Sequence, residues 1–349
     1  MPLINDYIHV KEIYNEAAEK RIALPAFNAE DRESLEAILA ATSELGQEIG
    51  VNDLPIVISW TSRYPFRSQM KLLTASGNPY LGMELMLSDL RIYSSEYSPY
   101  SKLRILPHLD HAFPWIDGDM IIKYADDFAS IMCDASEKSF EENVTITAKY
   151  VEKLKGKVLI EGAVDEIFES GSGEIKNELT TVEQAKEFVS KTRVDLIVPN
   201  VGTEHRSTTD KVKYYGERAR EISKVVGKIL CLHGVSSLDK NGLSRLPDDG
   251  FVKVNIFTTL VVKSGQGMVD FILKNLGHIF NREQLEKYIK NDILGKSVLN
   301  TNVSADDISI KPKLDYVSNN LRRDIWFKIY KETCKEFLYL LNYRGFANH

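Results

Sequence analysis

The feature that most constrains the fold of this chain is an alternation of short apolar runs with longer stretches of helical periodicity. Such alternation is typical of βα units, in which each strand of a parallel sheet is followed by a helix that returns the chain. Eight runs can be counted, and eight is the number of strands in a (β/α)₈ barrel. They are residues 22–27, 55–60, 104–109, 128–133, 157–161, 194–199, 228–232 and 251–256. The sequence therefore predicts an α/β protein of the TIM-barrel class.

Two of the connecting helices have clear start signals. The segments 139–142 (SFEE) and 181–184 (TVEQ) are capping boxes, in which side-chain oxygens satisfy backbone amides of the first helical turn. Apolar residues recur at helical spacing behind each box. Each helix therefore leads directly into the next predicted strand.

Two regions do not fit the simple alternation. Residues 62–103 are long for one connection and rich in Tyr, Ser and Met, which predicts a helix with an elaborated loop after the second strand. Residues 261–349 continue past the eighth run and predict a mainly helical C-terminal extension, within one domain over residues 1–349. The last helix should pack its apolar face against the barrel or a neighbouring subunit. That face comprises Trp326, Ile329, Tyr330, Thr333, Phe337 and Leu341.

The composition limits the partners that the chain can have. With 43% hydrophobic and 27% charged residues, it is that of a protein with a large core, and the formal net charge is -6. Lys and Arg are scattered, which argues against nucleic acid or an anionic membrane, although local positive groups can still bind a small anion. No signal peptide or membrane span is recognisable, so we expect a cytoplasmic protein. The chain has three cysteines, Cys133, Cys231 and Cys334, which are too few and too widely spaced for a disulfide framework or a Cys-rich zinc site. We expect them to be buried.

The positions of the histidines carry the chemical argument. His108 and His111 follow the third predicted strand, while His205 follows the sixth and His233 the seventh. In a (β/α)₈ barrel the carboxyl ends of all strands meet on one face, so three imidazoles from three strands can converge there. Three imidazoles are a natural ligand set for a zinc ion that keeps one position open for water or substrate. Each histidine alone could instead be a hydrogen-bonded structural residue, as we expect for His9, His278 and His349.

Six segments, in order along the chain, resemble the signatures of the class II (zinc-dependent) fructose-bisphosphate and tagatose-bisphosphate aldolases. They are LPAFNAED (24–31), HLDHA (108–112), residues 131–152, residues 180–205, LCLHGVSS (230–237) and FVKVNIFTTL (251–260). Residues 62–103 and 261–320 are unlike the usual members. The resemblance implies a metal-dependent aldolase, a carbon–carbon lyase that acts on a phosphorylated sugar.

The resemblance implies that His111, His205 and His233 hold one catalytic Zn²⁺, with a monovalent cation as a second candidate cofactor. It also implies that Asp110 is the acid/base acting on the hydroxyl of the carbon whose bond is cleaved. The chemistry agrees, since Zn²⁺ is a Lewis acid able to hold the charge of an enediolate, and a carboxylate beside a ligand lies close to the reacting atoms. Asp110 could instead orient a ligand histidine. Three further positions match residues near the metal and are expected to orient ligands or hydrogen-bond the substrate: Asp134, Ser136 and Glu161.

The segment after the fifth strand departs from the family. Members carry Glu-Leu-Gly there, on a mobile loop whose glutamate removes the carbon-bound proton, whereas this chain reads LIEGAVDEIFESGSGE over 159–174. Ala163 replaces the family's second glutamate. Glu166 or Glu169 could supply the base, with the glycines at 171 and 173 giving mobility. These acids could equally form a solvated face.

The phosphate pocket implied by the resemblance is also altered. Arg206 stands where members have Gly, while Phe257 and Thr259 stand where Asn or Asp is usual. Arg206 could clamp an anion. The remaining candidates for binding substrate and phosphate, through small residues, amides and hydroxyls, are Asn28, Thr61, Gly234, Ser236, Asn255 and Thr258. The donor should resemble dihydroxyacetone phosphate, and the alternative is a specialised pathway aldolase with a different substrate.

Two other functions stay open at this point. Lys253 on the eighth strand could form a Schiff base with the substrate, although that mechanism would leave the clustered histidines unexplained. The chain could also be a non-catalytic descendant that uses Arg206 and the 62–103 insertion to bind a ligand or partner. The C-terminal helix and the Tyr-rich insertion could cover a subunit interface, and the resemblance implies a homo-oligomer.

Overall fold

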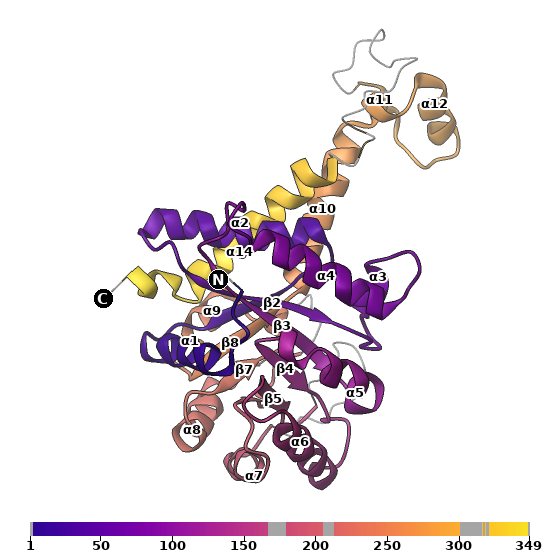
Figure 1. Cartoon of the computed structure of the whole chain (residues 1–349). Helices are drawn as coiled ribbons and strands as arrows, with labels where there is room; N and C mark the ends of the chain where they lie inside the picture. Colours follow the sequence, from indigo (N-terminus) through magenta and orange to yellow (C-terminus); the bar gives the residue numbers. More distant parts are fainter. Residues whose placement is uncertain are drawn as a thin grey trace. The chain divides into compact units, whose positions relative to one another are not determined.

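The computed structural model describes residues 3–166, 179–204, 213–300, 316, 318 and 321–347. Within them, eight parallel strands form a closed barrel in chain order, with β8 paired to β1 (Figure 1). The predicted (β/α)₈ barrel is confirmed, and each predicted apolar run overlaps a strand. The strands are β1 (Leu24–Asn28), β2 (Pro55–Thr61), β3 (Arg104–Ala112), β4 (Ser130–Cys133), β5 (Leu159–Ala163), β6 (Leu196–Val198), β7 (Leu230–Leu232) and β8 (Phe251–Ile256).

The strands are buried on both faces, as expected for a parallel sheet that is covered by helices. Arg104 is the one strand residue, among those described, that is not fully buried. Both predicted capping boxes are present, at Ser139 and Thr181. The helices that follow β1 and β3 to β7 are α2 (Arg32–Ile49), α5 (Pro114–Lys123), α6 (Phe140–Leu154), α7 (Val182–Thr192), α8 (Gly216–Val226) and α9 (Lys240–Arg245).

The helix α1 (Tyr7–Glu19) precedes the barrel and makes polar contacts near the starts of β3 and β7. It contacts both β5 and β8, which lie on different sides of the barrel. Arg104, the first residue of β3, forms an ion pair with Glu16 at 2.8 Å, and the Lys228 ammonium donates to the Ala18 carbonyl at 3.0 Å. These contacts lie where strands begin, and the site is expected at the opposite end, where the strands finish.

The insertion after β2 contains two helices, α3 (Gln69–Leu72) and α4 (Pro79–Tyr93). Asn78 caps α4 by accepting hydrogen bonds from the amides of Tyr80 and Leu81. The buried face of α4 packs on the barrel, where the Trp60 indole N–H lies 3.2 Å from the Met83 sulfur. The predicted helix with an elaborated loop is therefore present.

The chain divides into two compact units, one of residues 1–258 with 334–349 and one of residues 259–333. The second unit holds most of α10 (Thr258–Lys274), together with α11 (Leu276–Ile279) and α12 (Arg282–Lys290). The helix α14 (Lys328–Leu340) begins in this unit and ends in the first, where Phe337 packs edge-on against Phe27 of β1, with ring centroids 6.3 Å apart. The single-domain organisation over residues 1–349 stays a prediction.

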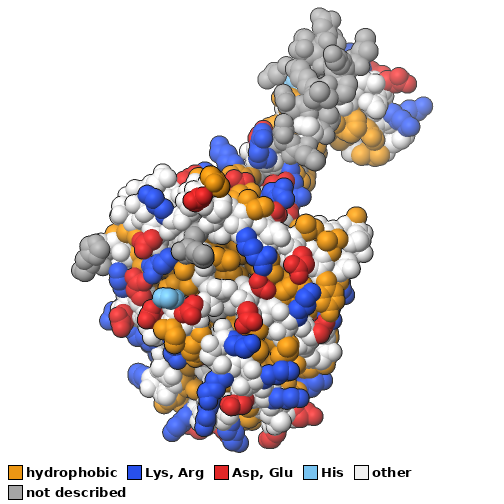
Figure 2. Space-filling model, in the orientation of Figure 1, with side chains coloured by type: hydrophobic (Ala, Val, Ile, Leu, Met, Phe, Trp, Pro, Cys, Tyr) orange, Lys and Arg blue, Asp and Glu red, His pale blue; other side chains and the backbone are white. Residues whose placement is uncertain are grey.

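The surface of the molecule carries both signs of charge. On the face drawn in Figure 2, Lys and Arg side chains are interspersed with Asp and Glu. The three cysteines are unpaired and buried, as predicted. Among the described residues, no helix is both long enough and apolar enough to cross a membrane.

A glycine sets how closely α4 approaches α3. A Cβ at Gly82 would collide with the backbone carbonyl of Met70. Gly82→Ala should therefore destabilise the fold by about 1–3 kcal/mol, because backbone atoms must shift. Gly118→Ala, in α5, is the matched control, since its Cβ would meet only the end of the Tyr150 side chain. Urea unfolding of both variants checks this, and equal stabilities would contradict it.

Candidate functional site

Asp110 and His111 lie at the end of β3, where the strand is irregular. Side chains of a regular strand alternate between its faces, so these neighbours would normally point apart. The pairing of β3 with β4 shifts register between Leu109 and Ala112, and His111 has a left-handed φ of 43°. Irregularities of this kind re-aim side chains, and strained backbone is often found at functional sites. As a result, Asp110 and His111 both line the same cavity.

The His111 imidazole is bound to the carboxylate of Asp134, which follows β4. Nδ1 of His111 lies 2.7 Å from Oδ2 of Asp134, whose other oxygen accepts hydrogen bonds from the amide and hydroxyl of Ser136 at 3.1 and 2.7 Å. Burial alone would raise the pKa of Asp134, but the hydrogen bond and charge of His111 lower it. An ionised Asp134 keeps a proton on Nδ1, so Nε2 is the nitrogen of His111 that can bind a cation.

His233 follows β7 and has the same kind of carboxylate partner. Its Nε2 lies 3.2 Å from Oε1 of Glu161 on β5, so Nδ1 is the nitrogen that can bind a cation. The hydroxyl of Thr203 donates to the His233 carbonyl at 2.7 Å, which fixes the backbone here. Gly234 has a φ of 72°, and a Cβ there would press on the backbone of Glu204, so only glycine fits without strain.

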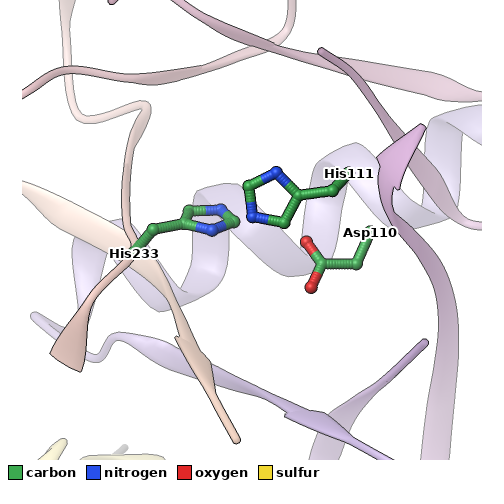
Figure 3. Close-up of side chains that lie close together, drawn as sticks. All are labelled: Asp110, His111 and His233. Carbon is green, nitrogen blue, oxygen red and sulfur yellow. The ribbon is translucent and has the colours of Figure 1, made fainter. Parts of the chain in front are cut away.

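Asp110, His111 and His233 form a group that can hold a metal ion. Each offers a ligand atom, and these atoms all lie within 4.8 Å of one another. Figure 3 shows the two imidazole rings pointing toward each other from different strands, with the Asp110 carboxylate beside them. Imidazole nitrogens and carboxylate oxygens, with each histidine held by a further carboxylate, are donors that suit Zn²⁺.

The Asp110 carboxylate is oriented by two amides. Asn28 of β1 donates to its Oδ2 at 3.0 Å, and Asn255 of β8 donates to its Oδ1 at 2.9 Å. Burial alone would raise the pKa of Asp110, but His111 and His233 outweigh this and hold the pKa well below its ordinary value. Asp110 is therefore ionised and fixed, either beside the metal or as one of its ligands.

A buried lysine connects the strands beneath the site. The Lys253 ammonium on β8 is fully buried and donates to Glu161 at 2.7 Å, to Asn255 at 2.7 Å and to Nε2 of His108 at 3.0 Å. Burial and the charge of Lys253 lower the pKa of His108 to about 3, so His108 is neutral, and its Nδ1 lies 2.8 Å from the Ser130 hydroxyl. His108 is thus a structural residue. Lys253 is not among the described residues that line the cavity, and its ammonium is occupied by these contacts. Both observations argue against a Schiff base between Lys253 and a substrate.

This network should dominate the stability of the barrel interior. Lys253→Met should destabilise the protein by about 3–5 kcal/mol, because Glu161 would keep its buried charge without the ammonium. In the double variant Lys253→Met/Glu161→Met, the free energy of unfolding should fall by less than the sum of the decreases in the two single variants. Urea unfolding of the three variants tests this, and strictly additive losses would contradict the pairing.

The predicted substrate residues surround one cavity at the carboxyl ends of the strands. It holds about 610 Å³ of empty space, and all six predicted binding residues that the structure describes line it: Asn28, Thr61, Gly234, Ser236, Asn255 and Thr258. A second cavity of about 390 Å³ also borders His111 and is lined by Asp134, Ser136 and the exposed Glu166. Glu161 lines neither cavity and is buried below them. The predicted Glu169, His205 and Arg206 lie outside the described residues.

Sequence reasoning missed a group of residues that line the first cavity from the segment that follows β2. They are Tyr64, Arg67 and Gln69. The side-chain oxygen Oε1 of Gln69 accepts a hydrogen bond from the backbone N–H of Thr61 at 2.8 Å. Their position directly after a barrel strand was the available signal, because loops at that end of a TIM barrel build its active site.

Arg67 places a positive charge at the cavity. Its guanidinium binds the Glu30 carboxylate with both Nε and Nη2, the latter at 2.8 Å, and lies 5.6 Å from the centre of the Phe257 ring. Among the described residues that line this cavity, Arg67 is the only Lys or Arg. Phe257 stands where the family usually has a polar residue, so Arg67 brings polarity to this wall from the loop that follows β2.

Arg63 anchors the same segment to α5. Its guanidinium donates to Asp119 at 2.6 Å and to the Ile116 carbonyl at 2.7 Å, and its Nε lies 3.7 Å from the fully buried Asp117. Burial raises the pKa of Asp117 to about 6, despite the charge of Arg63.

A pH dependence of stability follows from Asp117. A carboxyl group whose pKa is raised in the folded state stabilises the fold at low pH, and this contribution is lost as the pH rises from the ordinary value to the raised one. Between about pH 4 and pH 6, the free energy of unfolding of the unsubstituted protein should therefore fall by up to about 3 kcal/mol relative to that of Asp117→Asn. Urea unfolding of both proteins at pH 4 to 7 measures this. Parallel stability profiles would contradict it.

Comparison with known proteins decides the family. The family described as fructose-bisphosphate aldolase class-II matches residues 8–299. The chain belongs to this family. This class II aldolase is therefore an enzyme, a carbon–carbon lyase, and the expectation drawn from the six sequence segments is confirmed. Membership favours an aldolase over the non-catalytic alternative.

Solved structures share the fold of this class II aldolase at low sequence identity. A fructose-bisphosphate aldolase from Campylobacter jejuni has a TM-score of 0.72 and 21% identity, covering 97% of this chain and 95% of that chain. The YdjI aldolase from Escherichia coli K12 has a TM-score of 0.62 and 19% identity, covering 97% and 98%. A putative fructose-1,6-bisphosphate aldolase from Coccidioides immitis has a TM-score of 0.66 and 20% identity, covering 98% of each chain.

Proposed function

We propose that this class II aldolase catalyses the reversible aldol cleavage of a phosphorylated ketose, with Zn²⁺ held by His111, His205 and His233. One observation carries the proposal. The imidazoles of His111 and His233, from β3 and β7, converge at the carboxyl end of the barrel, and each has its outer nitrogen on a carboxylate. His205 is included because it matches the family signature.

When bound, Zn²⁺ supplies a Lewis acid for the oxygens of the substrate. The chain's own residues supply orientation and proton transfer. Asp110 is ionised, and hydrogen bonds from Asn28 and Asn255 fix the orientation of its carboxylate. The carboxylate can therefore take the proton of the substrate hydroxyl during cleavage and return it during synthesis. For the carbon-bound proton we propose Glu166, which lines the second cavity, with Glu169 as the alternative.

The cavity favours a substrate with an anionic end. Gly234, Ser236 and Thr258 offer backbone amides and hydroxyls of the kind that bind phosphate, and Arg67 brings a guanidinium, paired with Glu30, to the same cavity. We propose a donor that resembles dihydroxyacetone phosphate. Arg206 would add a second cation if it points to the same cavity.

The altered wall supports a second candidate, an aldolase of a specialised pathway with a ketose other than fructose 1,6-bisphosphate. Phe257 offers no hydrogen bond where the family usually does, and Arg67 lies over its ring. Two of the structural neighbours carry the fructose-bisphosphate name and YdjI does not. A cytoplasmic location, a homo-oligomeric assembly and a monovalent cation also stay predictions.

Chelation and one substitution test the proposal. Cleavage of a panel of phosphorylated ketoses should be abolished by EDTA and restored by Zn²⁺. Asp110→Asn should lower kcat by about 10²- to 10⁴-fold, the usual worth of a positioned acid/base. Ser76→Ala, in an exposed turn of the insertion, is the control and should keep full activity. Aldol cleavage that persists after complete removal of metal, or full activity in Asp110→Asn, would contradict the mechanism.

A further inference from the structure

We propose that Tyr64 is a positioning residue of the metal centre, whose ring holds the His111 imidazole in the orientation that binds a divalent cation. This inference rests on the proposed function, since it takes His111 as a metal ligand. Tyr64 belongs to the 62–103 insertion, which is unlike the usual family members. The insertion would thereby contribute to the metal site and not only to the substrate cavity.

The contact between the two rings is direct. The ring centroids of Tyr64 and His111 lie 4.6 Å apart with an interplanar angle of 15°, so the rings are stacked. Such a stacked arrangement is one that aromatic rings favour. His233, by contrast, meets His111 at 4.8 Å and 75°, an edge contact. Tyr64 therefore packs against the flat face of the His111 imidazole, while His233 contacts the same imidazole edge-on as a neighbouring candidate ligand.

The stacked ring opposes a motion of His111 that its hydrogen bond to Asp134 does not oppose. The hydrogen bond from Nδ1 to Asp134 fixes one edge of the ring, but this bond by itself does not oppose a tilt of the ring about that edge. The backbone at His111 is in the left-handed region within a strand irregularity, so it lacks the regular pairing that fixes most strand side chains. A flat ring packed parallel to the imidazole opposes this tilt, which would displace Nε2 from the metal.

Tyr64 is itself held in place. Its ring packs edge-on against Phe66, at 5.2 Å and 61°, and against Phe113, at 5.5 Å and 84°. The preceding residue, Arg63, is bound to α5 through Asp119 and the Ile116 carbonyl. Tyr64, like His111, lines both cavities. A platform fixed by these neighbours can transmit its orientation to the imidazole.

The experiment measures metal affinity without relying on turnover. Apo protein of full length is titrated with Zn²⁺ against a chromophoric chelator, and with Co²⁺ to record the visible absorption bands of the site. Tyr64→Leu should weaken Zn²⁺ binding by about five- to tenfold and change the Co²⁺ bands, because a stacked pair and an orienting neighbour are lost. Tyr64→Phe keeps the ring and should bind within about twofold of the unsubstituted protein.

Tyr97→Leu is the matched control. It removes the same kind of side chain from the 62–103 insertion at a position that is 89% exposed, and it should leave Zn²⁺ affinity nearly unchanged. Circular dichroism checks folding of each variant, and Tyr64→Met, which also lacks a ring, takes the place of Tyr64→Leu if that variant unfolds. Zn²⁺ affinity in Tyr64→Leu equal to that of the unsubstituted protein would overturn the inference. Equal weakening in Tyr64→Phe would also overturn it, because the hydroxyl and not the ring would then matter.

One further variant separates this inference from the proposed function. His111→Ala should abolish tight Zn²⁺ binding. If Zn²⁺ binding is undiminished in His111→Ala, the proposed metal centre is wrong and the role of Tyr64 falls with it. If binding depends on His111 but not on Tyr64, only the role of Tyr64 is wrong.

Discussion

The buried ion pair of Lys253 and Glu161 is the interaction on which the geometry of the site depends. A charge removed from water must be paired and hydrogen-bonded, and Lys253 meets this requirement with Glu161, Asn255 and His108, which lie on three different strands. Two of these partners reach the site directly, since Glu161 binds His233 and Asn255 binds Asp110. One ammonium thus sets the positions of a candidate ligand and of the candidate acid/base. The closed sheet makes this possible because it brings β3, β5 and β8 around a common interior.

The sequence predicts the fold and the position of the site because both depend on periodic patterns. Eight apolar runs define the strands, and the carboxyl ends of parallel strands meet on one face, so residues that follow those runs must gather there. The two histidines after β3 show the limit of this reasoning. Spacing places His108 and His111 equally near the site, but the strand irregularity turns His111 to the cavity and leaves His108 in the interior. A register shift has no signal in the hydrophobic pattern, so the resemblance to the family was needed to choose between them.

The residues missed by sequence reasoning belong to a segment without periodicity. Tyr64, Arg67 and Gln69 reach the cavity because Arg63 is fixed on α5 and because Gly82 lets α4 approach α3 closely. These are tertiary contacts between distant parts of the chain, and no local pattern encodes them. The carboxylate partners of the histidines are an intermediate case. Asp134 follows a strand and Glu161 lies on one, and both were found because their positions match those of the family. Which imidazole nitrogen each carboxylate binds could not be predicted from the sequence.

Under the proposed function, metal binding and substrate choice belong to different parts of the molecule. His111, His233 and their carboxylate partners lie on strands or directly after them, where packing fixes side chains closely enough for metal coordination. The wall of the cavity that departs from the family is formed by the loop after β2 and the end of β8, where Arg67 lies over Phe257 and binds Glu30. Loops at this end of a TIM barrel can change without disturbing the strands. The same chemistry can then serve a different sugar, because an anion held by a long guanidinium side chain is placed differently from one held by a short polar group on β8. Under the proposed function, we therefore expect substitutions at Arg67 and Phe257 to change the choice of substrate, and substitutions at Asp110 and the histidines to change the aldol reaction itself.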